Sequence, residues 1–393
     1  MTPDDDGTQR TQPPTAPAGR VRSFLFGLLT VTLASLAGLV LVEIGLGALR
    51  GHIEGSDRMD KGLFRYDPNL GWALTRDWTG RHRHYDFDTD YAVNTFGFRG
   101  APLFGGAGAR IPVTAIYGDS FTFGLGVTDD QTFTAQLNEL AGGARAFDNM
   151  GVPGYSTDQE LLLAERGLDL LQADRVLLVT YLANDLIDNM NPFPVQVHNA
   201  KPLFRLRDGA LVLENVPVPR AAKPTAERAR TLGDLILDGI VPVSRGPVLD
   251  WMAGTEIARW SGLLPPRWPD DLAARFRAHA GPSLALYQAL VLRLRDGLAA
   301  KGIRLDVALM PGRSMLVDSD GASARYQDVI RQDILSGLDA AGVPVIDLAA
   351  ELSRKRAAVG ASEAADWFYP NEGHLTAKGH RVVAELLLRR VSD

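Results

Sequence analysis

The 393-residue sequence contains no cysteine, and its 41 basic residues are outnumbered by 47 acidic ones. Without cysteine the chain has no disulfide, no cysteine nucleophile and no thiolate metal site. No run of lysine and arginine stands out as a track for phosphates, so we expect no nucleic-acid partner. Hydrophobic residues make up 46% and charged residues 22%, which is typical of a globular protein with a sizeable core.

Charge is also absent from residues 24–42, FLFGLLTVTLASLAGLVLV. A helix of this length spans about 28 Å, close to the thickness of a hydrocarbon core. Arg20 and Arg22 precede the run. The positive-inside rule therefore places the N-terminus in the cytoplasm and everything after Leu49 outside, in the periplasm or the extracellular space.

Two other interpretations of this run fit the sequence less well. A cleaved signal peptide is disfavoured because the run is long and no clear small-residue cleavage site follows it. A buried helix of a soluble core is disfavoured because apolar residues cover every face. We expect Glu43, at the outer end of the run, to reach headgroups or water, and we assign it no catalytic role.

Beyond this run, continuous apolar segments alternate with amphipathic ones. The expected strands are 111–117, 145–148, 174–182, 303–310 and 343–348, and the expected helices are 130–141, 157–172, 282–301, 324–341 and 376–391. Continuous apolar strands separated by amphipathic helices predict an α/β fold with a parallel sheet covered on both faces.

We divide the chain into a disordered cytoplasmic tail at 1–22, a transmembrane anchor at 23–49, an aromatic-rich lead-in at 50–110 and an α/β domain at 111–393. Residues 190–280 interrupt the alternation of strands and helices. Within them, FRLRDGALVLENV predicts a hairpin that turns at Asp208-Gly209. We interpret 190–280 as an insertion or cap beside the site.

Polar residues follow three of the expected strands, and a histidine precedes the last helix. The segments are Gly118-Asp119-Ser120, NMGVPG at 149–154, AND at 183–185, and YPNEGHLTAKGH, which contains His374. Ligands of open α/β sheets bind beyond the carboxyl ends of the strands. A serine, glycine N–H donors, an amide and a histidine are the groups that acyl transfer requires. Each group alone is also typical of turns and caps, so their order and shared edge favour the functional interpretation.

These segments resemble the SGNH hydrolases, also called GDSL esterases and lipases, over roughly residues 86–390. GDSFTFG resembles the first block of the family, which implies Ser120 as nucleophile. NMGVPGYST and LAND resemble the second and third blocks, which implies that Gly154 and Asn184 form the oxyanion hole with the Ser120 N–H. NEGH resembles the last block, with His374 as base. The lead-in YAVNTFGFRG at 91–100 is similar to membrane-anchored bacterial members. The family implies a flavodoxin-like three-layer αβα fold and chemistry that needs no cofactor or metal.

The sequence departs from the family pattern at two positions. Leu182 stands where the third block commonly has glycine, and Asn371 stands where the last block commonly has aspartate. Some relatives carry the acid one residue later, where this chain has Glu372. A carboxylate both orients the histidine and stabilises the imidazolium, so the chemistry favours Glu372 whereas the commoner spacing favours position 371. Asp366 is a more distant candidate, and a serine–histidine dyad without an acid is the remaining alternative.

Two further features indicate a structural role. We expect Asp119 to stabilise its turn by local hydrogen bonds. His82 and His84 stand at alternate positions of RHRHYDFD, which we interpret as an exposed strand and not as a metal site.

The sequence thus predicts a membrane-anchored, extracytoplasmic serine esterase that hydrolyses acyl esters of an envelope glycan or lipid through an acyl-enzyme, with acetyl as one candidate group. One alternative is an O-acyltransferase in which a sugar hydroxyl replaces water. Another is a catalytically silent glycan-binding protein on the same fold. The acyl chain length, the acceptor, the oligomeric state and any protein partner stay open.

Overall fold

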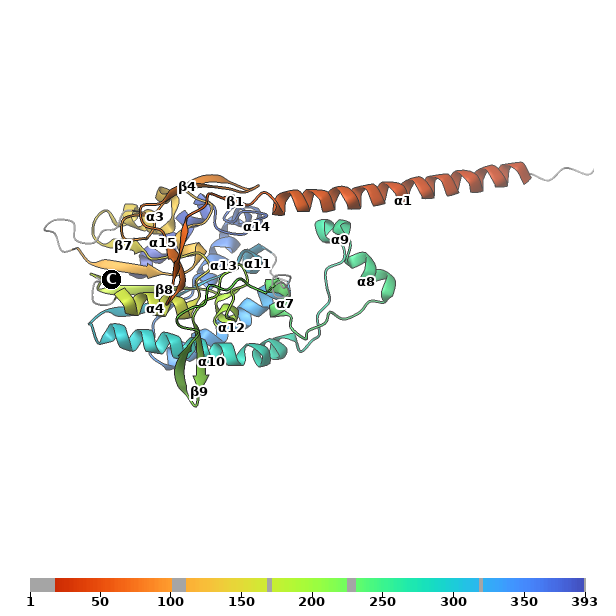
Figure 1. Ribbon diagram of the computed structural model, residues 1–393. Helices are drawn as coiled ribbons and strands as arrows, with labels where there is room; N and C mark the ends of the chain where they lie inside the picture. Colours follow the sequence, from red (N-terminus) through yellow and green to blue (C-terminus); the bar gives the residue numbers. More distant parts are fainter. Residues whose placement is uncertain (1–17, 101–110, 168–171, 225–230, 318–320, 392–393) are drawn as a thin grey trace, which may run out of the picture. The chain divides into compact units, whose positions relative to one another are not determined.

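The computed structural model describes residues 18–100, 111–167, 172–224, 231–317 and 321–391 (Figure 1). The chain divides into two compact units. One unit comprises the first 54 residues together with 244–266, and the other comprises 55–243 together with 267–393. The second unit contains the central sheet and the candidate site.

A five-stranded parallel sheet forms the centre of the second unit, in the order β12-β11-β8-β6-β7. Its strands are β6 (Val113–Tyr117), β7 (Ala146–Asn149), β8 (Arg175–Tyr181), β11 (Arg304–Met310) and β12 (Val345–Ile346). Each strand lies within or overlaps an expected one, so the predicted parallel sheet is confirmed. Strand β12 is shorter than expected because the next helix already begins at Leu348.

Alternate side chains of the central strands contact two separate hydrophobic cores. Tyr117 and Leu178 belong to the core that contains α4 (Thr157–Gly167), α10 (Leu272–Ala299) and α12 (Ala322–Ala340). Ile116 and Leu177 belong to the core that contains α3 (Phe133–Ala141), α13 (Leu348–Val359) and α15 (Ala377–Val391). Because successive strand side chains point to opposite faces, helices cover both faces of the sheet (Figure 1). This is the predicted three-layer αβα fold.

Helix α10 is longer than the expected helix at 282–301. It begins at Leu272, since Leu272, Phe276 and Ala280 are buried and continue its apolar stripe at a spacing of four residues. The expected helix at 157–172 ends at Gly167, and residues 168–171 lie outside the described residues. The shorter helices are α2 (Ser120–Phe123), α5 (Asp185–Asp188), α7 (Leu232–Ile236), α11 (Arg313–Val317), α14 (Ala361–Ala365) and a 3-10 turn at Asp129–Gln131.

The described lead-in beyond α1 contains two separate groups of antiparallel strands. Strand β4 (Thr79–Arg83) pairs with β1 (Arg58–Met59) and β5 (Asp88–Ala92), and β2 (Phe64–Asp67) pairs with β3 (Gly71–Leu74). In the insertion, β9 (Leu203–Arg207) and β10 (Ala210–Glu214) form the predicted hairpin. Both of its turn residues have positive φ, 50° at Asp208 and 79° at Gly209, as two-residue hairpin turns require.

His82 lies on β4, which is exposed at Thr79, Arg81 and Arg83 as expected, but His82 itself is buried. Its ring is 3% exposed and packs edge-on against Phe87, with the two ring centroids 4.9 Å apart. One ring nitrogen lies 2.9 Å from the hydroxyl of Tyr91 and the other lies 2.6 Å from a carboxylate oxygen of Asp57. His82 is therefore a buried histidine with a partner for each ring nitrogen, and these contacts hold parts of the lead-in together.

The first unit contains α1 (Ala18–Glu54), α8 (Pro247–Ala253) and α9 (Glu256–Ser261). The part of α1 from Arg22 to Glu54 is long and apolar enough to cross a membrane. Glu43 makes contacts that the sequence did not predict. Its two carboxylate oxygens accept the backbone N–H groups of Glu256 and Ile257, at 2.7 and 3.0 Å. These are the first amides of α9, which lack intrahelical partners.

Candidate active site

Ser120 stands at the carboxyl end of β6, at the first residue of the short helix α2. Asp119 precedes it as the N-cap, and its side chain accepts the N–H of Phe121 at 2.9 Å. Asp119 therefore stabilises this turn locally. Position 118 has room only for glycine, because a Cβ there would lie 2.2 Å from the hydroxyl oxygen of Thr122. The Ser120 N–H belongs to the first helical turn, whose amides have no intrahelical acceptor.

A chain of short contacts joins Ser120, His374 and Glu372. The Oγ of Ser120 lies 2.6 Å from Nε2 of His374, and Nδ1 of His374 lies 2.6 Å from Oε1 of Glu372. The second oxygen of Glu372 accepts the backbone N–H of His374 at 2.9 Å. An ionised carboxylate can only accept hydrogen bonds, so the ring carries its proton on Nδ1. Nε2 is then free to accept the hydroxyl proton of Ser120.

Asn371 and Asp366 are not brought to His374. The backbone and side-chain N–H groups of Asn371 donate to the carboxylate of Asp86, at 2.8 and 2.6 Å. Asp366 lies 3.6 Å from the ammonium of Lys378. Asp86 also accepts the N–H of Glu372 at 2.8 Å. Among the candidate acids, the structure therefore places Glu372 against the histidine, and the lead-in residue Asp86 holds the loop that carries it.

Burial and the interaction between His374 and Glu372 have opposite effects on the pKa values of the two groups. Burial by itself would lower the pKa of His374, but the charge of Glu372 and the hydrogen bond to it outweigh this effect, so the pKa lies above its ordinary value. Burial would likewise raise the pKa of Glu372, but the interaction with His374 brings it below the ordinary value. Each partner thus favours the charged form of the other.

Gly154 and Asn184 follow the two strands that flank β6. Strand β6 pairs with β7 on one side and with β8 on the other, so the segments after all three strands meet at one edge of the sheet. The loop after β7 is tied to the serine turn, because the N–H of Val152 donates to the carbonyl of Gly118 at 3.0 Å. Gly154 has a φ of +79°, and a Cβ there would lie 2.3 Å from Val197. This position therefore requires glycine.

Asn184 occupies the N-cap position of α5, yet its side chain makes no capping hydrogen bond. Its Nδ2 donates to Oδ2 of Asp188 at 3.0 Å. The other oxygen of Asp188 accepts the N–H of Val195 at 2.9 Å. One N–H of the Asn184 amide is thus held by a fixed acceptor, which orients the second N–H of the same planar amide. The spacing of four residues from Asn184 to Asp188 was a readable signal that the sequence analysis missed.

Arg99 is a second residue that the sequence analysis missed. Its buried guanidinium donates to the carbonyls of Phe123, Gly124 and Val127, which follow the serine turn, and its Nε lies 2.6 Å from the carboxylate of Asp129. Tyr91 packs against it with 4.4 Å from the guanidinium carbon to the ring centroid. Both residues lie in YAVNTFGFRG, so this block of the lead-in braces the loop that follows Ser120.

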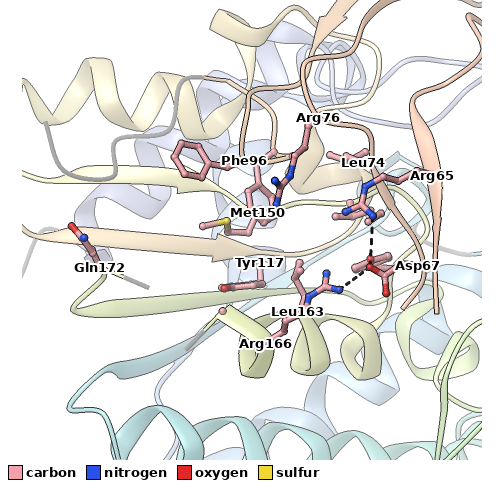
Figure 2. Close-up of a pocket in the computed structure, with 16 residues that line it drawn as sticks. Arg65, Asp67, Leu74, Arg76, Phe96, Tyr117, Met150, Leu163, Arg166 and Gln172 are labelled. Carbon is pink, nitrogen blue, oxygen red and sulfur yellow. Dashed lines mark hydrogen bonds and ion pairs between the residues drawn. The ribbon is translucent and has the colours of Figure 1, made fainter. Parts of the chain in front are cut away.

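A cavity of about 750 Å³ lies between the lead-in and the sheet (Figure 2). Arg65 and Arg166 both point to the carboxylate of Asp67, and Tyr117 and Met150 form part of its wall (Figure 2). None of the candidate site residues described above lines it. This cavity is therefore separate from the nucleophile.

Comparison with known proteins identifies one family. The profile of the GDSL-like lipase/acylhydrolase family matches residues 116–382. No curated protein sequence matches the chain. The fold is similar to a lipolytic protein of the G-D-S-L family from Veillonella parvula DSM 2008, with 12% identity, a TM-score of 0.37, and coverage of 71% of this chain and 98% of the other. It is also similar to a lipase/acylhydrolase from Enterococcus faecalis, with 12% identity, a TM-score of 0.36, and coverage of 72% and 96%. An acetylxylan esterase from Geobacillus stearothermophilus, solved as a catalytic mutant, has 10% identity, a TM-score of 0.38, and coverage of 72% and 94%.

Proposed function

The chain belongs to the GDSL-like lipase/acylhydrolase family and is a serine ester hydrolase of the SGNH type, and we propose that Ser120, His374 and Glu372 are its catalytic residues. The observation that carries this assignment is the unbroken series of contacts from Oγ of Ser120 through the imidazole to the carboxylate of Glu372, each 2.6 Å long. A nucleophile within hydrogen-bond reach of a base, with the base oriented by a third group, is the arrangement that nucleophilic acyl transfer requires.

In the first half-reaction, Nε2 of His374 takes the hydroxyl proton of Ser120 while Oγ attacks the ester carbonyl carbon. The carbonyl oxygen becomes an oxyanion, which accepts hydrogen bonds from the N–H groups of Ser120 and Gly154 and from Nδ2 of Asn184. Glu372 stabilises the imidazolium that forms. The tetrahedral intermediate then collapses, the bond to the alcohol breaks, and His374 returns its proton to the departing alcohol oxygen.

In the second half-reaction, a water molecule gives its proton to His374 and attacks the acyl-enzyme. The acid is released, and Ser120 regains its proton. We propose that the substrates are acyl esters of an envelope glycan or lipid, acetyl esters among them. Residues 23–49 anchor the chain as a single span, with the N-terminus in the cytoplasm. The second unit, which we call the catalytic unit, lies in the periplasm or outside the cell. The uncharged run at 24–42 and Arg22 before it support this orientation.

The nucleophile is tested by treating the purified full-length protein with a fluorophosphonate probe and mapping the adduct by mass spectrometry. Ser120→Ala is the matched control. We expect one adduct, at Ser120, and none in the variant. An adduct elsewhere, or no adduct on folded protein, would contradict the assignment. Hydrolysis of short and long acyl esters by the same two proteins identifies the acyl group. Transfer to an added sugar hydroxyl in preference to water would establish the transferase alternative.

A further inference from the structure

Residues 244–266 lie in the same unit as α1 and expose large apolar side chains. Val248, Leu249, Trp251 and Met252 on α8, Trp260 on α9 and Leu263 after it are all exposed, with Trp251 at 73% and Leu263 at 76%. We call this group of six side chains the apolar patch. Isolated apolar side chains are ordinary on a protein surface, but six large exposed ones within one short segment, two of them tryptophans, indicate an interaction site.

The charged groups of the same segment are bound within the unit. They are Arg245, Asp250, Glu256 and Arg259, and their charges sum to zero. The carboxylate of Asp250 is bonded by the hydroxyl of Ser244 and the backbone N–H of Arg245. Glu256 is buried and pairs with Arg259 at 2.8 Å and with Arg50 of α1 at 2.9 Å. The acidic groups of the segment are thus paired within the unit, whereas its large apolar side chains are exposed, which is the reverse of a water-facing surface.

The contact between α9 and α1 fixes the level of this segment along α1. The carboxylate of Glu43 accepts the first two amide groups of α9, and Glu43 directly follows the uncharged run at 24–42. Arg50, about two turns further along α1, pairs with the same end of α9. The beginning of α9 therefore lies at the outer end of the apolar run. In a membrane, this is the headgroup boundary, where tryptophan is enriched.

We propose that residues 244–266 are a membrane-surface segment, in which the apolar patch enters the outer interface of the bilayer that α1 crosses. The patch lies in the same unit as the exposed apolar surface of α1, and α9 contacts α1 directly, which argues for lipid as its occupant. Because the segment has no net charge, binding rests on apolar burial and not on attraction to anionic headgroups. The ends of the segment join the catalytic unit, where the N–H of Val243 donates to the carbonyl of Arg267 at 2.7 Å. The catalytic unit is thus attached to the membrane at a second point. This inference rests on the proposed anchoring by α1.

The absence of cysteine allows a direct test in the full-length chain. Trp251→Cys and Leu263→Cys are each labelled with an environment-sensitive fluorophore and reconstituted into vesicles of phosphatidylcholine. The vesicles carry a nitroxide either near the headgroup or at the end of the acyl chain. Leu33→Cys, within α1, marks the bilayer centre, and Leu213→Cys, an exposed apolar position on β10, is the matched control in the catalytic unit.

We expect the fluorescence emission of the labels at 251 and 263 to shift to the blue and to be quenched more strongly by the headgroup nitroxide. The label at 33 should be quenched more strongly by the nitroxide at the end of the acyl chain. The extent of quenching at 251 should not change with salt or with added phosphatidylglycerol. A blue shift without quenching would place a second copy or another protein on the patch and overturn the proposal. No blue shift would leave the patch in water and overturn it as well. If the label at 33 is not quenched either, the proposed anchoring by α1 is wrong. If the label at 33 is quenched but those at 251 and 263 are not, only the proposal of a membrane-surface segment is wrong.

Discussion

The carboxylate of Glu372 lies 2.6 Å from Nδ1 of His374, two residues further along the same loop. The intervening residue, Gly373, has a φ of +90°, which turns the loop so that Glu372 can bond both the ring and the backbone N–H of His374. Position 371, where relatives commonly carry the acid, bonds to Asp86 instead. A short-range contact at a spacing of two residues thus places a carboxylate against the imidazole of His374.

Replacement of Glu372 by Gln should lower kcat by about 10⁴-fold, the loss seen when the acid of a serine triad is removed. The amide retains the size of the side chain but supplies no countercharge for the imidazolium. Asn371→Ala is the matched control and should reduce kcat only mildly, since its side chain contacts Asp86 and not the histidine. Equal losses in the two variants, or a faster Asn371→Asp enzyme beside a silent Glu372→Gln, would assign the acid to position 371.

The same substitution should move the acid limb of the pH profile. Catalysis needs neutral His374, and the charge of Glu372 keeps the pKa of His374 above its ordinary value against the opposing effect of burial. Removing that charge leaves burial, which lowers the pKa of His374. The residual activity of Glu372→Gln should therefore persist to lower pH than the activity of the wild type. Profiles of kcat/KM against pH check the sign, and a shift of the acid limb to higher pH would contradict it.

Asn184→Ala should lower kcat by about 10²–10³-fold, the usual loss for one oxyanion donor. A helix-capping role would instead cost about 1 kcal/mol of stability with unchanged kinetics. The side chain of Asn184 makes no capping hydrogen bond and donates to Asp188, which favours the kinetic outcome. Kinetics and thermal unfolding measured on the same variant separate the two roles. A lowered melting temperature with unaltered kcat would leave Asn184 as a structural residue only.

Much of the fold was predictable because it depends on local patterns. Continuous apolar strands and amphipathic helices indicated the parallel sheet and its two helical layers. The segment GDS was expected at the end of a strand, and β6 does end at Tyr117, three residues before Ser120. Gly154 requires positive φ, which a glycine in a strand-to-helix loop already suggests.

The remainder depended on contacts between distant residues. Asp86 bonds a loop 285 residues away in the sequence, and no local pattern announces such a partner. The guanidinium of Arg99 is buried among carbonyl groups of another segment. In the sequence, by contrast, an arginine in a glycine-containing segment such as FGFRG is typical of a surface loop. The burial of His82 was not predicted, because alternation shows which residues share a face but not which face is covered. The lead-in was therefore the part of the second unit least accessible from sequence.

Arg99→Lys should reduce both stability and turnover. Lysine keeps the charge but cannot present the planar set of donors that reaches three carbonyls and Asp129 at once, so buried acceptors near the serine turn lose their partners. We expect an unfolding free energy lower by about 1–3 kcal/mol and a reduced kcat. The matched control is Arg81→Lys, an exposed lead-in arginine that pairs with Asp88, which should change either quantity little. If the two variants behave alike, Arg99 does not brace the nucleophile loop.

Lys201 and Asp158 form an ion pair in the catalytic unit, and their side chains are both fully buried and bonded to each other. Lys201→Met should lower the free energy of unfolding by about 3–5 kcal/mol, because it leaves Asp158 as an uncompensated buried carboxylate. Burial already raises the pKa of Asp158, and Lys201 opposes that rise. In the variant, the folded state therefore binds a proton that the unfolded state releases near pH 4, so stability should fall as the pH rises above that value.

Two further variants decide whether this loss comes from the unpaired charge. The double variant Asp158→Asn with Lys201→Met should recover part of the stability and lose the added pH dependence. The surface pair Lys355–Glu385, with its atoms 3.0 Å apart and both side chains partly exposed, provides the control. Lys355→Met should cost less than about 1 kcal/mol. Chemical denaturation of the four proteins at several pH values measures all of these quantities. If Lys201→Met were no more destabilising than Lys355→Met, the buried lysine would not be compensating Asp158.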